Sequence, residues 1–284
     1  MDKPQNQIEG GTPTYVAPAY GASPAGSQPT EPAEPARLGP LQRFTGTLFS
    51  PGETFQDINR KPTFLVPLLA AIVIGISLAL FNSWRVKPDA ERIVRQQVKE
   101  QAARTGNQPS EEQIDQGVKF AKIFSNPLVV VASVSIITPI VLLFYSGVYA
   151  LFLMLIQAKA TFKKILSVVA WSSLATGVLN AIVIVAVLMV KDQEALNNVD
   201  LSKPGELAPT NVAAFLPAGG SPVLRALAAN FDIFSIWWLI LLVIGFAAIA
   251  GSRKIKTSQT AKIVFASWFV WLLVRAGWAA VIGR

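Results

Sequence analysis

Five long apolar runs, separated by polar stretches, dominate the hydrophobic pattern of this chain. They cover residues 63–84, 127–157, 165–190, 232–251 and 262–283. The hydrocarbon core of a bilayer is about 30 Å thick, so about 20 apolar helical residues cross it. Backbone groups in lipid must satisfy one another's hydrogen bonds, which favours a helix for each run. The pattern predicts an all-α integral membrane protein with five transmembrane helices.

Two short basic turns join four of these runs in pairs. The turn at 158–164 joins the second run to the third, and the turn at 252–262 joins the fourth to the fifth. Each pair is therefore predicted to be an antiparallel transmembrane hairpin. The second run would be about 46 Å long as a continuous helix, so we expect tilt or a kink at Pro139 to absorb the excess.

The amino-terminal region divides into two parts. Residues 1–37 contain seven of the 19 prolines and show no hydrophobic periodicity. Such a segment cannot bury enough surface to offset its ordering entropy, so a disordered Pro-rich tail is predicted, followed by a membrane domain at 38–284. Between 38 and 61 two short surface helices are expected. Leu41, Phe44 and Leu48 share one helical face, and Arg43 lies away from it.

Two polar excursions interrupt the runs, at residues 85–126 and 191–231. The first contains a capping-box pattern at 110–113 and is predicted to form an extramembrane helical hairpin between the first and second spans. The numbers of Lys and Arg on the two sides of the membrane do not decide orientation. Basic residues crowd the span ends on the side of the tail, so we expect a cytoplasmic N-terminus.

The composition agrees with a lipid bilayer as the surroundings. Hydrophobic residues make up 52% of the chain and charged residues 15%, whereas about 25% is typical of soluble domains. The net charge is +8, but no basic block interleaved with aromatic residues occurs outside the apolar runs. The basic residues are interpreted as flanks of membrane spans, and no nucleic-acid partner is expected.

The sequence offers little catalytic chemistry. Cysteine and histidine are both absent, which removes thiol nucleophiles and the commonest zinc ligands. No P-loop, nucleophile elbow or pair of carboxylates occurs inside the apolar runs. We therefore expect no catalytic residues, no cofactor and no metal site, and an intramembrane hydrolase ranks last among the functional hypotheses.

Four residues form a candidate intramembrane polar layer. Arg275 is the one charge well inside a run, and Asp232 begins the preceding run. Antiparallel helices place these two residues at a similar depth, so a contact or a shared polar layer is predicted. Thr176 and Asn180 lie near the middle of the third run. A substrate or proton site is one interpretation; interhelical hydrogen bonds and an orienting ion pair are the favoured one.

Small residues recur every four positions in two of the runs, and such stripes let helices approach closely. They are Ala71, Gly75 and Ala79 in the first run, and Ser173, Gly177 and Ala181 in the third. Both stripes are predicted helix-packing positions.

Three stretches together resemble a known family. They are Ser-Pro-x-Glu-Thr-Phe at 50–55, the sequence at 161–171, and the sequence at 232–237 with Gly245 further on. In this order they are similar to bacterial members of the Yip family, membrane proteins named for interaction with Ypt/Rab GTPases. The resemblance covers about residues 40–282. It implies a five-helix membrane domain with a cytosolic amino-terminal region, placed in the bacterial cytoplasmic membrane.

The eukaryotic branch of the Yip family implies roles in vesicle traffic, with small GTPases and other Yip-type proteins as partners. The Asp-Leu-Tyr-Gly-Pro signature of that branch is missing here, and Leu174 and Ala175 stand where a proline is common. Small GTPase binding is therefore doubtful for this chain. The family has no established catalytic residues to carry over.

The leading hypothesis is a non-enzymatic multi-pass membrane protein that acts through helix packing and partner binding, with a role in membrane organisation or a trafficking-like process. Its partners would be a second copy of the chain or other membrane proteins. The alternative is a transporter or channel subunit, in which the four residues of the polar layer line a path. A cavity reaching Asn180 would favour this alternative, and a tightly packed centre would disfavour it.

Overall fold

The computed structural model describes residues 1, 37–86, 90–106, 109–193, 196, 208–217, 221–251 and 255–282. The predicted Pro-rich tail lies outside these residues, apart from its two end positions. The described residues form helices and no named strand, with a single bridge between Asn211 and Asp232. The elements in chain order are α1 (Pro40–Phe49), α2 (Pro51–Arg60), α3 (Leu65–Val86), α4 (Ala90–Thr105), α5 (Glu111–Phe124), α6 (Pro127–Leu155), α7 (Phe162–Val190), η1 (Val212–Phe215), α9 (Pro222–Ala228), α10 (Ile233–Ile249) and α11 (Thr257–Ile282).

Four of the described helices are long and apolar enough to cross a membrane, namely α3, α6, α7 and the Thr257–Val281 part of α11. The fourth predicted run forms α10, which has 17 residues and is therefore about 25 Å long. Two residues set the start and the end of α10. Asp232 caps its first turn, and Gly251, just beyond its end, has a φ of +65°, a conformation that glycine adopts easily after a helix.

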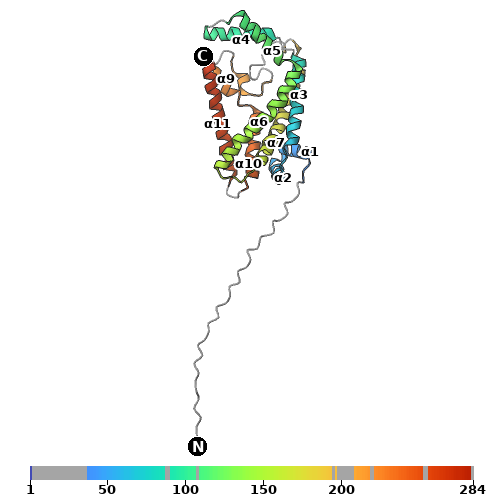
Figure 1. The fold of residues 1–284 in the computed structure, drawn as a ribbon, viewed down its shortest axis with the longest axis vertical. Helices are drawn as coiled ribbons and strands as arrows, with labels where there is room; N and C mark the ends of the chain where they lie inside the picture. Colours follow the sequence, from blue (N-terminus) through green and yellow to red (C-terminus); the bar gives the residue numbers. More distant parts are fainter. Residues whose placement is uncertain are drawn as a thin grey trace. The chain divides into compact units, whose positions relative to one another are not determined.

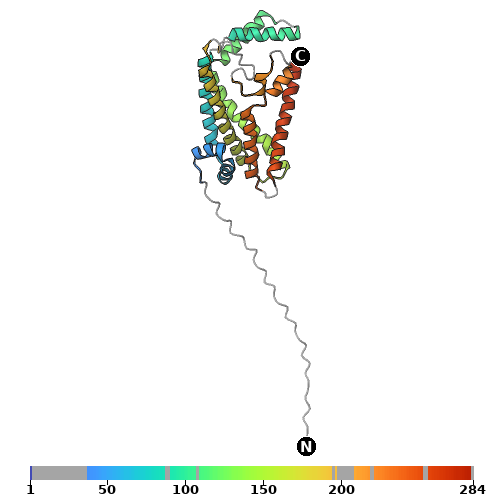
Figure 2. The same ribbon diagram turned by 180° about the vertical axis from the view of Figure 1, so that it is seen from behind.

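The long helices lie side by side in one bundle (Figures 1 and 2). One end carries α1, α2, the α6–α7 turn, the last turn of α10 and the first turn of α11. The opposite end carries α4, α5, α9 and the last turn of α11. Burial is greater on α7 than on α3 or α6, since 28% of the most apolar stretch of α7 is buried, against 6% in each of the other two.

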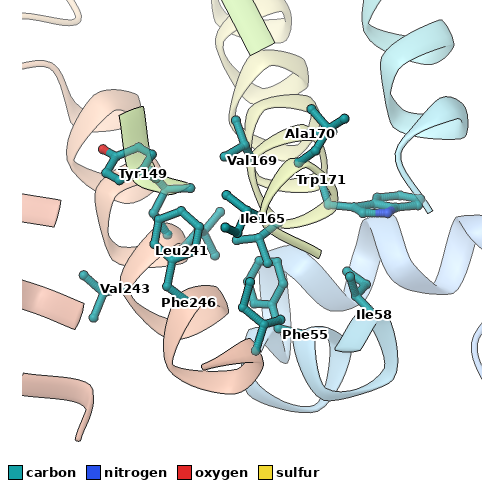
Figure 3. Close-up of a cluster of buried hydrophobic side chains, with 14 of the residues drawn as sticks. Phe55, Ile58, Tyr149, Ile165, Val169, Ala170, Trp171, Leu241, Val243 and Phe246 are labelled. Carbon is teal, nitrogen blue, oxygen red and sulfur yellow. The ribbon is translucent and has the colours of Figure 1, made fainter. Parts of the chain in front are cut away.

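The tightest part of the core joins α2 to α7 and α10. Phe55 and Ile58 of α2, Val168 of α7 and Phe246 of α10 are all fully buried. Figure 3 shows Phe55, Ile58 and Phe246, with Phe55 between α7 and α10. A Cβ atom at Gly245 would overlap Val168 and lie 3.3 Å from the Phe55 ring. Glycine therefore allows the close approach of these three helices.

The polar excursion between α3 and α6 forms two helices, which lie across the end of the bundle (Figures 1 and 2). The predicted capping box is present, because Ser110 and Gln113 exchange side-chain and backbone hydrogen bonds. Arg95 of α4 contacts Glu91 in its own helix and Glu111 of α5, both at 3.1 Å. Ile114 and Val118 of α5 are buried, and a Cβ atom at Gly117 of α5 would lie 3.0 Å from Val94 of α4. Apolar packing therefore joins the two helices.

Candidate functional site

A buried ion pair lies at the end of the bundle where α1 and α2 dock. The Arg43 Nη2 and Asp57 Oδ2 atoms are 2.7 Å apart, and each side chain is 5% exposed. The Arg43 Nε–H also donates to Asp57 Oδ2, at 2.9 Å. Taking two charges out of water is costly, so a buried pair of this kind needs further hydrogen bonds to be stable.

Those further bonds are present around both side chains. Arg43 Nη1 donates to the Lys61 carbonyl at 3.1 Å and to Thr63 Oγ1 at 2.6 Å. The Arg37 backbone N–H donates to Asp57 Oδ1 at 2.8 Å, and the Trp171 indole N–H donates to the Thr63 carbonyl at 2.9 Å. We call Arg43, Asp57, Thr63 and Trp171 the clamp. It ties α1 and α2 to the residues before α3 and to α7.

The clamp holds Asp57 in its charged form. Burial raises the pKa of this carboxyl, but the hydrogen bond from the Arg37 N–H and the adjacent Arg43 guanidinium outweigh burial and lower the pKa below 3.8 overall. Asp57 is therefore ionised at neutral pH and stays matched to the always-charged Arg43.

The expectation that Arg43 lies away from the buried face was wrong. Its side chain is buried, whereas Leu41, placed on the apolar face by the periodicity, is 75% exposed. Periodicity assigns charges to water unless a partner is known, and the partner here is 14 residues away on another helix. The available signal was Asp57 itself, which falls among the buried Phe55 and Ile58 of α2 and so requires a compensating cation.

A cavity of about 630 Å³ opens between α6, α7, α10 and α11. It is lined by all four residues of the predicted polar layer, Asp232, Arg275, Thr176 and Asn180, together with the polar side chains of Thr138, Ser173, Asn230 and Ser235. Whether these residues act as a site stays a prediction. Their lining of one cavity places charge and hydrogen-bonding groups around a single space inside the helical bundle.

Asp232 reaches this cavity from the start of α10. Its Oδ1 atom accepts hydrogen bonds from the backbone N–H groups of Phe234, at 2.9 Å, and Ser235, at 3.2 Å. Its Oδ2 atom has no hydrogen-bond donor among the described residues. One carboxylate oxygen thus caps the helix, and the other stays available to a ligand.

Arg275 reaches the cavity from α11. Its Nη1 donates to Asn230 Oδ1 at 3.5 Å, and this is its one hydrogen bond among the residues that the structure describes. The ion pairs between described residues do not include one from Asp232 to Arg275. Two opposite charges therefore line the same cavity without neutralising each other by direct contact.

The two neutral residues of the predicted layer differ in their hydrogen bonding. The Thr176 hydroxyl donates to the Ser172 carbonyl one turn earlier in α7, at 2.9 Å, and the residue is buried. Asn180 is half-buried and lines the cavity. A ligand in the cavity would thus meet the Asn180 amide more readily than the Thr176 hydroxyl.

Parts of the small-residue stripes pack against neighbouring helices of the same chain. A Cβ atom at Gly75 would lie 3.1 Å from Val134 Cγ1 of α6. On α7, Ser173 Oγ accepts a hydrogen bond from the Trp238 indole of α10, at 3.0 Å. Gly177 is different, because a Cβ there would meet nothing within 4 Å and the residue borders the cavity.

No group of three or more potential metal-ligating side chains occurs among the described residues.

Comparison with known families gave one finding. A family model described as the Yip1 domain matches residues 45–281, from α1 to α11. Neither the curated proteins nor the solved structures gave a match. The matched range contains Asp57 and every residue that lines the cavity, and it begins two residues after Arg43.

Proposed function

Because the chain belongs to the Yip1 domain family, we propose that this integral membrane protein is non-enzymatic and acts by binding other membrane proteins or a second copy of itself. In this proposal α10 is a fifth, short span beside the four long ones. The N-terminus lies in the cytoplasm, and the membrane is the bacterial cytoplasmic membrane. Membrane organisation or a trafficking-like role is the process that such binding would serve.

The clamp supports partner binding because it fixes α1 and α2 as a rigid surface at one end of the bundle. This surface presents two large apolar side chains, with Leu41 75% exposed and Phe49 83% exposed. Exposed apolar groups on a rigid element are typical of surfaces that contact a membrane or another protein.

Site-specific photocrosslinking in native membranes tests this proposal. A photoreactive residue in place of Phe49 is expected to give crosslinked protein products of defined mass. The matched control is a photoreactive residue in place of Glu112, an exposed position on α5, and it is expected to give none of these products. Adducts with lipid alone from Phe49, in a strictly monomeric protein, would overturn partner binding.

Reporter fusions at the two ends test the topology. Five spans place the ends on opposite sides, with the N-terminus in the cytoplasm. An N-terminus outside the cytoplasm would reverse the orientation. Both ends on one side would remove α10 from the count of spans, as its length of 17 residues allows.

A transporter or channel subunit is the second candidate, and it is favoured by a specific observation: the cavity is lined by Asn180. A path here would use Thr176, Asn180, Asp232 and Arg275. Solute flux into proteoliposomes that the Gly177→Leu variant abolishes would support this candidate, because the new side chain would fill the open space at this wall. Flux unaffected by this change would count against it.

A further inference from the structure

The cavity holds two opposite charges that the protein keeps apart. Asp232 has a free carboxylate oxygen, and Arg275 makes a single long hydrogen bond among the described residues. Arg275 is exposed and Asp232 half-buried, so a ligand can reach both charges. A ligand that carries one negative and one positive group would satisfy both, whereas a purely anionic or purely cationic ligand would leave one of them facing a like charge.

An apolar groove continues from this cavity towards the outside of the bundle. It has a volume of about 210 Å³ and lies between α6 and α11. The cavity and the groove share Tyr145, Trp238, Leu239, Trp268 and Trp271 in their linings. Phe144 and Val274 line the groove and are exposed on the outer surface of the bundle. The groove is thus lined by aromatic and aliphatic side chains and opens where lipid surrounds the protein.

The combination of a charged cavity and an apolar groove matches one class of molecule, an amphiphile with a zwitterionic head. We propose that the cavity binds the headgroup of a phosphatidylethanolamine-type phospholipid and that the groove holds part of one acyl chain. The phosphate faces Arg275, and the primary ammonium donates to Asp232 Oδ2. Hydrogen bonds between ionised groups are the strong ones, and a quaternary ammonium headgroup cannot donate them.

This site is distinct from the partner binding proposed above, because Leu41 and Phe49 of α1 line neither the cavity nor the groove. It also differs from a solute path, because a bound phospholipid would occupy the space that such a path requires. The surrounding bilayer supplies the ligand at high local concentration, so modest affinity is sufficient for occupancy.

Native mass spectrometry of the purified protein tests the proposal. The protein is delipidated in mild detergent and then given an equimolar mixture of phosphatidylethanolamine, phosphatidylcholine and phosphatidylglycerol with identical chains. Phosphatidylethanolamine adducts are expected to predominate. Equal retention of the three lipids, or predominance of phosphatidylglycerol, would overturn the proposal.

Two charge variants separate the roles of the two residues. Asp232→Asn keeps a good helix cap and is expected to lower the preference for phosphatidylethanolamine about tenfold, the low end of what a hydrogen bond to a charged group contributes. Arg275→Gln is expected to lower retention of all three phospholipids. Lys262→Gln removes a positive charge elsewhere on α11. It should alter neither the preference for phosphatidylethanolamine nor the retention of the three phospholipids. An unchanged preference in Asp232→Asn would contradict the assignment of the ammonium.

Two glycine-to-leucine variants, one at the cavity and one away from it, keep the test informative if a charge variant folds poorly. Gly177→Leu places a side chain at the cavity wall, and Gly147→Leu places the same side chain on α6 away from the cavity; a Cβ at either position meets nothing within 4 Å. Loss of phospholipid adducts in Gly177→Leu alone supports the site. Full retention in Gly177→Leu overturns it.

Discussion

The protein contains two pairs of opposite charges in settings that differ sharply. Arg43 and Asp57 are 2.7 Å apart, buried and surrounded by hydrogen-bond partners. Asp232 and Arg275 line one cavity of about 630 Å³ and make no ion pair with each other in the described part of the chain. The same chemical groups thus hold the fold together at one place and remain available to a ligand at the other.

The clamp region and the cavity also differ in how tightly their glycines are packed. Near the clamp, Gly245 allows α2, α7 and α10 to touch, and any larger side chain would meet Val168 and Phe55. Beside the cavity, Gly177 has open space around it. Interiors are close-packed, so a polar opening bounded by a small residue is an exception, and it is the place where a ligand is proposed to bind.

The largest expected effect comes from breaking the clamp. Arg43→Met leaves a buried carboxylate without its cation and should lower the free energy of unfolding by about 3 kcal/mol. Unfolding by SDS in mixed micelles measures this loss. The double variant Arg43→Met with Asp57→Leu should recover most of it, because an apolar pair can replace a buried ion pair. No recovery would show that the two residues do not act together.

A change in packing should have the next largest effect. Gly245→Ala forces the new Cβ against Val168 and Phe55 and should cost about 2 kcal/mol in the same unfolding assay. Gly177→Ala is the control and should cost nothing, because its Cβ enters open space. Equal losses in the two variants would contradict the contrast between a packed clamp region and an open cavity.

Removing one neutral hydrogen bond of the clamp should have a smaller effect. Trp171→Phe keeps the aromatic ring in the core but loses the indole N–H that donates to the Thr63 carbonyl. The expected loss in the free energy of unfolding is about 1 kcal/mol. A loss as large as that of Arg43→Met would mean that packing of the indole ring, rather than the hydrogen bond, holds α7 to the clamp.

Acid should weaken the clamp over a narrow range of pH. The folded-state pKa of Asp57 is lowered, so its contribution to stability is complete above its ordinary pKa of 3.8 and is lost as the pH falls through the lower folded value. Thermal unfolding midpoints of the wild type should therefore fall below pH 3.8 more steeply than those of Asp57→Asn. Parallel curves for the two proteins would contradict the lowered pKa.

The smallest effect is expected for the exposed ion pairs of α4 and α5. Arg95 contacts Glu91 and Glu111 at the surface, where water and salt screen ion pairs. Arg95→Gln should leave the unfolding midpoint unchanged within error. A marked shift would show that α4 and α5 depend on these charges, rather than on the apolar seam that contains Ile114 and Val118.

Much of the fold could be predicted from the sequence, for a physical reason. Apolar runs of this length have few stable alternatives to a lipid-embedded helix, so α3, α6, α7 and α11 followed from hydropathy alone. The helix of the fourth run was predicted as well, since α10 covers Ile233–Ile249 of the predicted 232–251. Its role as a span stays a prediction, because its 17 residues make it shorter than the other four. The family resemblance of residues 50–55 and the later stretches was confirmed by the match over residues 45–281.

The two charged sites could be predicted less completely. The polar layer was proposed from the antiparallel order of two helices, which places Asp232 and Arg275 at one depth. Sequence alone could not tell whether they touch, because this depends on the space between the helices. The clamp was missed since the pairing of Arg43 with Asp57 arises from the folding of α1 against α2, which hydrophobic periodicity does not report.

A pair of double-mutant cycles tests the central contrast most directly, with unfolding measured on delipidated protein. For Arg43→Met and Asp57→Leu the losses should be strongly non-additive, with the double variant more stable than the sum predicts. For Arg275→Gln and Asp232→Asn the effects should add, because these two residues do not contact each other without a ligand. Strong coupling between Asp232 and Arg275 in the absence of lipid would contradict the account.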